Sequence, residues 1–301
     1  MNDNKTETVS LYIKKDMKKT HNLIITILLA ASLSITMTAC HYDKPKSGRP
    51  MITVTVEPLR YFTEQIAGDK FDVVTLVPKG GSPETYEPTP QQMVDLANSE
   101  LLIKVGNLGF EQTWMRRLQD NSHHLIVIDS SEDIQRINGD NNAMPDPHTW
   151  MSTTNALVIA ENIYRALRLV DVKDSLYFKE RLSALRKTIL DTGVEIGAKL
   201  DSIPCKTFLI YHPSLTYFAN DYGLTQLAIE EDGHEPSTMA LRSLVRRAKE
   251  EGVKVMLVQR EYMNRDVMMV EKETGAKAVV INPLNYNWRE EMTGIADKLS
   301  K

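Results

Sequence analysis

Cysteine is nearly absent from this chain of 301 residues, which contains only Cys40 and Cys205. If Cys40 is modified, as the surrounding residues suggest below, no disulfide can form within the chain, whatever the redox compartment. We therefore expect Cys205 to be a buried, small apolar residue.

The chain also lacks an excess of basic residues, since 36 Lys and Arg stand against 40 Asp and Glu. Without residues 1–39, 31 basic and 37 acidic residues remain, which is a net charge of −6. An acidic body with no basic patch excludes nucleic acid as a partner. About 260 residues are enough for two lobes of ordinary domain size.

Long hydrophobic runs are missing as well, because none approaches the ~20 residues that a membrane-spanning helix needs. A short apolar run follows four lysines between positions 14 and 19 and fits a secretory signal. It ends Met37-Thr38-Ala39-Cys40, which resembles the lipobox at which bacterial lipoproteins are cleaved and lipidated. We expect a signal peptide at 1–39, lipidation on Cys40, and a polar tether at 40–50. Met17 could itself start the signal, which would make residues 1–16 a mis-assigned extension.

Short apolar runs alternate with helical patterns along the rest of the chain. Nearly continuous apolar runs are typical of strands that are covered on both faces. The predicted strands are 52–56, 73–77, 101–105, 125–128, 207–211, 226–229, 253–258 and 278–281, and the predicted helices include 91–99, 155–169, 239–251 and 266–274. The alternation predicts an α/β fold with two separate parallel sheets of four strands each.

Between the two halves, residues 175–200 contain no proline and carry apolar residues at helical spacing. A helix of this length would span about 39 Å. We expect a stiff strut whose apolar stripe faces the core. The predicted lobes are then 51–174 and 204–301, with the linking helix at 175–203.

Two segments place a histidine beside a proline where one element gives way to the next: Asp146-Pro147-His148-Thr149-Trp150 and Tyr211-His212-Pro213-Ser214. Parallel sheets bind ligands outside the carboxyl ends of their strands, and both histidines follow predicted strands. Neutral imidazole binds zinc at neutral pH and also suits manganese or nickel. The pattern therefore predicts a metal site between the lobes. The alternative is a pair of histidines that cap turns or fill polar core positions.

A third polar turn, residues 80–88, follows the predicted strand 73–77 and contains Glu84. Its carboxylate would add an anionic oxygen ligand, although a solvated loop carboxylate is the alternative. Pro83, Pro88 and Pro90 stiffen this turn and would hold the side chain in position.

Several neighbours of these segments have open roles. Asp146 could orient His148 or cap the following helix. Polar residues also follow strand 226–229, namely Glu230, Glu231, Asp232, His234 and Glu235, and His234 could line the cleft or begin the next helix. We expect Tyr86, Trp150, Tyr211 and Tyr217 to pack the lobe interface rather than to bind a ligand.

At these motifs the chain resembles the zinc and manganese receptors of ABC transporters, the cluster A-I or periplasmic zinc-binding family. The likeness covers nearly all of residues 50–300. It rests on residues 80–90, Asp146 to Trp150, Tyr211-His212-Pro213 with Tyr217-Phe218-Ala219 and Tyr222-Gly223-Leu224, Glu235-Pro236-Ser237, and Glu273-Thr274-Gly275-Ala276-Lys277 with Pro283-Leu284. The resemblance implies two Rossmann-like lobes joined by one long rigid helix.

The resemblance also implies four metal ligands. His148 and His212 match the family's second and third ligands. Glu84 stands where the family usually has a histidine, and Asn282 stands where it commonly has an aspartate. The His-rich acidic loop of many zinc members is missing too, because residues 130–145 contain no histidine.

These features predict a lipid-anchored, monomeric receptor outside the cytoplasmic membrane, on its periplasmic side or at the cell surface. It would capture Zn²⁺ and deliver it to an ABC permease for import, with Mn²⁺ as the alternative because carboxylates help manganese. Sulfur ligands, which copper(I) prefers, are absent from these motifs, and this argues against copper(I). A metallohydrolase is a further alternative, but no His-Glu-x-x-His motif or general base is evident, so we expect no enzyme. An adhesin with an incidental metal site also stays open.

Overall fold

The structure is a computed structural model that describes residues 48–120, 124–138, 144–230, 234 and 236–301. The expected signal peptide and Cys40 lie outside the described residues. All the described residues belong to one compact unit, Pro45–Lys301. Within the described part of the chain, no helix has both the length and the apolar character required to span a membrane.

The first half forms a parallel sheet in the order β2-β1-β3-β4. Its strands are β1 (Met51–Val54), β2 (Asp72–Thr75), β3 (Leu101–Lys104) and β4 (Ile126–Asp129), and helices α2 (Glu57–Ala67), α3 (Pro90–Ala97) and α4 (Gly109–Asp120) connect them. All four predicted strands are present, and their ends differ from the predicted ends by at most two residues.

The second half repeats this arrangement in a separate sheet with the order β6-β5-β7-β8. Its elements are β5 (Thr207–Ile210), α7 (Thr216–Tyr222), β6 (Thr225–Ala228), α8 (Thr238–Glu250), β7 (Val255–Gln259), the 3-10 turn η2 (Arg260–Tyr262), α9 (Arg265–Thr274), β8 (Lys277–Ile281) and α10 (Trp288–Leu299). The prediction of an α/β fold with two parallel four-stranded sheets is confirmed.

Side-chain caps fix where several of these helices begin. Thr89 and Gln92 form a reciprocal capping box at the start of α3. The Ser237 hydroxyl accepts a hydrogen bond from the Ala240 N–H and caps α8. Such caps satisfy backbone donors that the first turn of a helix leaves without partners.

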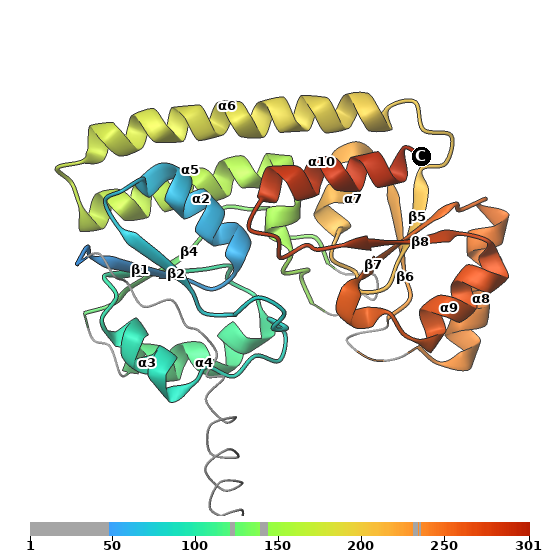
Figure 1. The fold of residues 1–301 in the computed structure, drawn as a ribbon, viewed down its shortest axis with the longest axis horizontal. Coiled ribbons are helices and arrows are strands. Elements are labelled where there is room, and N and C mark those ends of the chain that lie inside the picture. Colours follow the sequence, from blue (N-terminus) through green and yellow to red (C-terminus); the bar gives the residue numbers. More distant parts are fainter. Residues whose placement is uncertain (1–47, 121–123, 139–143, 231–233, 235) are drawn as a thin grey trace, which may run out of the picture. The chain divides into compact units, whose positions relative to one another are not determined.

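Two long helices, α5 (Thr153–Val170) and α6 (Ser175–Leu200), join the halves after the 3-10 turn η1 (Thr149–Met151). Figure 1 shows α6 running along one side of both sheets, with α5, α2 and α10 packed beneath it. Residues of α6 from Phe178 to Leu200 enter the core at helical spacing, and the predicted strut is present. Three apolar positions assigned to its core-facing stripe, Leu176, Leu190 and Val194, are instead more than half exposed.

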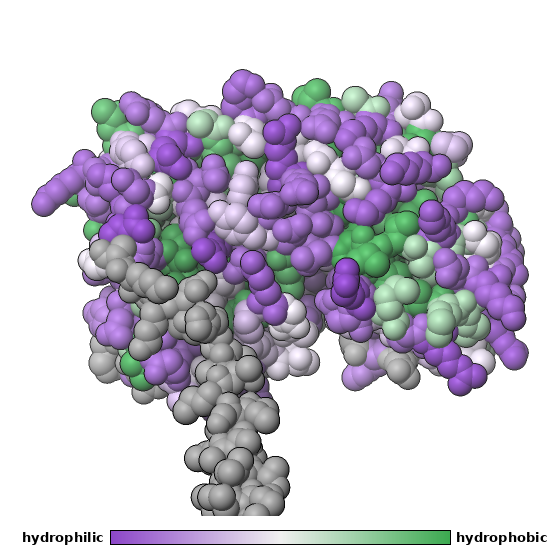
Figure 2. All heavy atoms as spheres, in the orientation of Figure 1, coloured by the Kyte–Doolittle hydropathy of each residue, from purple (hydrophilic) through white to green (hydrophobic). Residues whose placement is uncertain are grey.

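These exposed residues lie on the outer side of α6 because one helix face can pack on only one layer. Figure 2, drawn in the orientation of Figure 1, shows hydrophobic residues on the visible face as separate green patches within a largely hydrophilic surface.

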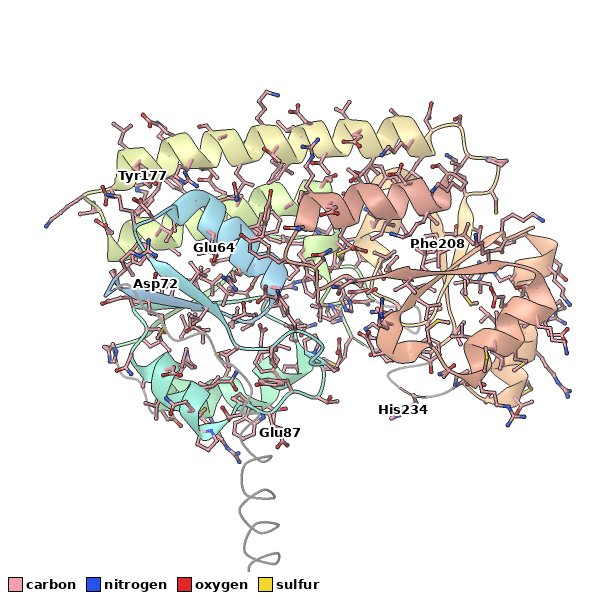
Figure 3. The ribbon with its side chains drawn as sticks, in the orientation of Figure 1. Glu64, Asp72, Glu87, Tyr177, Phe208 and His234 are labelled. Carbon is pink, nitrogen blue, oxygen red and sulfur yellow. The ribbon has the colours of Figure 1, made fainter. Side chains whose placement is uncertain are left out.

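Aromatic side chains pack between the two lobes. The Trp150 indole N–H donates to the Pro283 carbonyl at 2.8 Å, and the Trp288 indole N–H donates to the Trp150 carbonyl at 2.7 Å. On the α6 side, Tyr286 donates from its hydroxyl to Glu64 of α2 at 2.6 Å, and Figure 3 labels Glu64 on that helix. One buried cluster therefore runs through both lobes, and the expectation that Trp150 packs the interface is confirmed.

Cys205 differs from its expectation. It is partly exposed rather than buried, and its Sγ donates to the carbonyls of Thr207 and Glu251 at 3.3 and 3.4 Å. The residue lies in the connection before β5, within hydrogen-bond distance of these two backbone carbonyls.

Candidate metal centre

The fold brings Glu84, His148 and His212 together although they are far apart in the sequence. Each offers one ligand atom, and these atoms all lie within 4.8 Å of one another. Glu84 follows β2, His148 ends the long loop after β4, and His212 follows β5. The carboxyl ends of parallel strands are the expected place for such a site. Sequence reasoning identified all three, and their role as metal ligands stays a prediction.

His148 is held from one side by Asp146. The Asp146 carboxylate accepts from the His148 backbone N–H at 2.7 Å and contacts its Nδ1 at 2.8 Å. A carboxylate can only accept, so the proton of the neutral ring belongs on Nδ1, and the Nε2 lone pair is left for a metal. His148 is only 5% exposed, which fixes the ring further. Of the two roles considered for Asp146, orienting His148 is the one that the structure supports.

His212 repeats this arrangement with a different carboxylate. Its Nδ1 lies 3.0 Å from Oε2 of Glu230, the residue two positions beyond β6. Its Nε2 is buried and faces Oε1 of Glu84 at 3.5 Å, without a well-formed hydrogen bond. A buried nitrogen that lacks a well-formed hydrogen bond is costly, and a metal ion bound beside Glu84 would satisfy it.

Glu84 completes the group by facing both histidines. Its Oε1 lies 3.5 Å from His212 Nε2 and 3.8 Å from His148 Nε2, while its Oε2 accepts from the Ser82 hydroxyl at 2.7 Å. The backbone of Glu84 is pressed against the start of α4, where a Cβ on Gly109 would lie 2.5 Å from the Glu84 carbonyl oxygen. Glycine at position 109 is thus required for this close approach.

Electrostatics at the site favour a cation. Burial opposes ionisation of Glu84, but His212 and His148 outweigh it and lower the pKa of Glu84 to about 2. Burial likewise disfavours a charged His212, but Glu230 and Glu84 raise the pKa of His212 to about 10. Carboxylates therefore surround the two imidazoles, and a positive charge between them is stabilised.

The distances from the Glu84 oxygen to the two histidine nitrogens fit zinc. Zinc lies about 2.0–2.2 Å from its nitrogen and oxygen ligands, so ligands around a tetrahedral ion are separated by ~3.4 Å. The distances of 3.5 and 3.8 Å from Glu84 Oε1 to the two Nε2 atoms are close to that value. Two imidazoles and one carboxylate with an open position form a recognised zinc ligand set.

The fourth predicted ligand, Asn282, lies in the loop after β8 and is exposed. Its side-chain oxygen accepts a hydrogen bond from the Leu284 N–H at 3.1 Å, and its own backbone N–H donates to Glu291. The amide is thus engaged within its own loop, and metal coordination by Asn282 stays a prediction.

Other histidines lie apart from the three ligands. His124 and His234 are both exposed, and neither belongs to the group of ligand atoms described above. Figure 3 shows His234 at the lower edge of the second lobe. The neighbouring carboxylates Glu231, Asp232 and Glu235 lie outside the described residues.

Two residues of the site were not singled out by sequence reasoning. Glu230 was one of several carboxylates after a strand, and nothing local marked it as the partner of His212. Tyr262 follows β7 and stacks on the His212 ring, with centroids 5.6 Å apart and planes 26° apart. Burial raises the pKa of Tyr262, and Glu84 and Glu230 raise it further, so the phenol stays neutral beside the site.

Comparison with known proteins also indicates a metal-binding protein. Residues 52–300 match the family model of ZnuA, described as zinc-uptake complex component A, periplasmic. The high-affinity zinc uptake system protein ZnuA of Bacillus subtilis (strain 168) is 26% identical over 264 residues, which are 82% of this chain and 82% of that protein. The zinc-binding lipoprotein AdcA of Streptococcus pneumoniae (strain ATCC BAA-255 / R6) is 26% identical over 89% of this chain. The chain spans 56% of the length of AdcA.

Solved structures agree on the fold. A crystal structure of ZnuA superposes with a TM-score of 0.80 and 32% identity, covering 84% of this chain and 98% of that chain. A manganese-bound periplasmic metal binding protein from candidatus liberibacter asiaticus has a TM-score of 0.75 and 22% identity, over 83% and 100% of the two chains. The second likeness concerns the fold alone.

Proposed function

The chain belongs to the family of the periplasmic zinc-uptake component ZnuA, and from this membership we propose that it captures Zn²⁺ outside the cytoplasmic membrane for uptake through an ABC permease. The observation that carries the proposal is the geometry of Glu84, His148 and His212. Their ligand atoms are within 4.8 Å of one another, and carboxylates hold both histidines by Nδ1. Each Nε2 is thereby directed toward one shared position.

Zinc is favoured over manganese by the kind of ligand. Two imidazole nitrogens and one carboxylate oxygen suit zinc, whereas manganese prefers sites richer in oxygen. A manganese receptor of the same family is the second candidate, because Glu84 adds an oxygen where the resemblance implies a histidine. A competition between the two ions decides between them.

A transport role is also favoured over hydrolysis. A hydrolase would need a general base beside the metal-bound water. Among the residues that the structure describes, the carboxylates other than Glu84 that contact the histidines are Asp146 and Glu230, and each is engaged by an imidazole Nδ1. We therefore propose that the chain is not an enzyme and that the metal is its cargo.

Attachment to a membrane would come from Cys40. The lipobox-like sequence before Cys40 and the name of AdcA, a zinc-binding lipoprotein, support lipidation at this residue. We propose a lipid-anchored monomer. Residues 40–50 would connect the lipid anchor at Cys40 to the two lobes, which the linking helix at 175–203 joins.

The experiment is metal analysis of protein purified without chelator, followed by zinc and manganese competition on the stripped protein. The proposal expects about one zinc per chain and preference for zinc when both ions are present. Preference for manganese would support the second candidate. Protein that binds neither ion would overturn both the zinc and the manganese candidates. Hydrolysis of a substrate that stops when the metal is chelated would support a metallohydrolase instead.

A further inference from the structure

Helix α7 follows His212 in the chain and contacts the 3-10 turn η1 that follows His148. It belongs to the second lobe and begins at Thr216, four residues after His212. Its residue Tyr217 is only 2% exposed and reaches across to the loop of the first lobe that carries His148. The Tyr217 hydroxyl donates to the Asp146 carbonyl at 3.0 Å and accepts from the Ile137 N–H at 3.3 Å.

Gln226 of β6 fixes the start of this helix. Its side-chain amide donates to the Thr216 hydroxyl at 3.2 Å, and its side-chain oxygen accepts from the Leu215 N–H at 2.9 Å. Asp146 is therefore held at its carbonyl by a residue of the opposite lobe whose own helix start is fixed.

Asp146 is also the residue that orients His148 through Nδ1. The short segment from His212 to Tyr217 thus carries one histidine and fixes the support of the other. We propose that Tyr217 is a cross-lobe clamp, a positioning residue that holds His148 and His212 as a preassembled pair for the metal. The proposal rests on the metal-binding function proposed above.

The clamp supports the two histidines and leaves Glu84 to be held by other contacts. The two imidazole rings lie with centroids 5.1 Å apart and are tied to each other through Asp146 and α7. Glu84 is carried by another loop, packed against Gly109 of the first lobe. The histidine pair then keeps its geometry with and without metal, and Glu84 reaches it from a separately supported loop.

Loss of the Tyr217 hydroxyl leaves the buried Asp146 carbonyl and the Ile137 N–H without their shared partner. An unsatisfied buried group favours movement of the loop toward another partner. Groups that orient metal ligands typically change metal affinity by about 10- to 100-fold when they are removed.

The chain offers a matched control on the same helix. Tyr222 ends α7, and its hydroxyl hydrogen-bonds the Thr153 hydroxyl of the first lobe at 2.8 Å. It therefore attaches α7 to the opposite lobe without contacting Asp146 or His148. Tyr222→Phe removes the same chemical group at a similar structural cost.

The test measures zinc affinity by chelator competition, metal-free melting temperature and the visible spectrum of the cobalt(II) complex for wild type, Tyr217→Phe and Tyr222→Phe. We expect Tyr217→Phe to weaken zinc binding by about tenfold or more and to change the cobalt bands, which report the ligand geometry. Tyr222→Phe should lower the melting temperature comparably and keep the wild-type affinity and spectrum.

Wild-type protein that fails to bind zinc would overturn the proposed function and the clamp together. Wild-type protein that binds zinc while Tyr217→Phe binds equally well would overturn the clamp alone. Equal losses of affinity in both variants would also overturn it, because the effect would then follow from general destabilisation.

Discussion

Oε1 of Glu84 lies 3.5 Å from Nε2 of His212, although the two residues belong to different lobes and strands β3 to β5 and helices α3 to α6 come between them in the chain. This separation is that of two ligands on one tetrahedral zinc ion, ~3.4 Å. The contact therefore joins the lobes at the point where we propose that the cargo binds.

Removing either partner should weaken zinc binding. Glu84→Ala deletes the anionic ligand and His212→Ala deletes a nitrogen ligand, and each should lower zinc affinity at least about tenfold, or ~1.4 kcal/mol. Isothermal titration calorimetry measures the change. The control is Glu87→Ala, an exposed carboxylate of the same turn that Figure 3 labels. Wild-type affinity in both ligand variants would exclude this site.

Zinc binding should release a proton near neutral pH. In the metal-free protein the pKa of His212 is about 10, so the imidazole is protonated at pH 7. Zinc requires the neutral ring and displaces the proton. Calorimetry in buffers of different ionisation enthalpy should show about one proton released per zinc, and affinity should rise with pH. Binding enthalpies that do not depend on the buffer would refute this assignment of charge.

The metal-free protein should lose stability on the alkaline side through His212. Its folded pKa of about 10 lies above its ordinary value of ~6.5, so the stabilisation is full below pH ~6.5 and is lost as pH rises through about 10. The pKa of Glu84, about 2, is depressed, so its stabilisation is present above pH ~4.3 and is lost as pH falls through about 2.

Urea unfolding in the presence of chelator measures this dependence. His212→Gln should flatten the alkaline decline, whereas His124→Gln, which changes an exposed histidine, should leave it as in wild type. The same alkaline slope in wild type and His212→Gln would contradict the assignment.

Gly109→Ala should disturb the position of Glu84. The added Cβ would lie 2.5 Å from the Glu84 carbonyl oxygen, a backbone atom that can move only with its loop. We expect zinc affinity to fall by about tenfold, which corresponds to ~1.4 kcal/mol. In the control Gly197→Ala, within α6, the Cβ would meet nothing within 4 Å, and helix stability should rise by about 0.5–1 kcal/mol. Zinc affinity equal to wild type in Gly109→Ala would show that Glu84 does not depend on this contact.

Much of the fold could be predicted from the sequence because its strands are short apolar runs at regular spacing. The runs before His212 and around Leu102 are buried strands of the two sheets, as their patterns indicated. Residues 175–200 form one helix because nothing in that segment interrupts helical geometry. The exposed Leu190 and Val194 show the limit of such reasoning, since periodicity alone does not say how wide the buried face is.

The partners of the histidines were harder to predict. Asp146 lies two residues from His148, so local spacing pointed to it. Glu230 reaches His212 through strand pairing: Ile210 pairs with Ala228, and two residues farther along each strand His212 and Glu230 become neighbours. This register is a property of the assembled sheet, and the sequence offered several carboxylates in the same stretch. Tyr262 depends in the same way on the pairing of β7 beside β5.

The most direct test of the proposed site is the crystal structure of the zinc-bound protein with anomalous data at the zinc edge. We predict one zinc ion bound by Nε2 of His148, Nε2 of His212 and a carboxylate oxygen of Glu84, each at about 2.0–2.2 Å. Zinc found away from these three side chains, or held by the histidines through Nδ1, would contradict it.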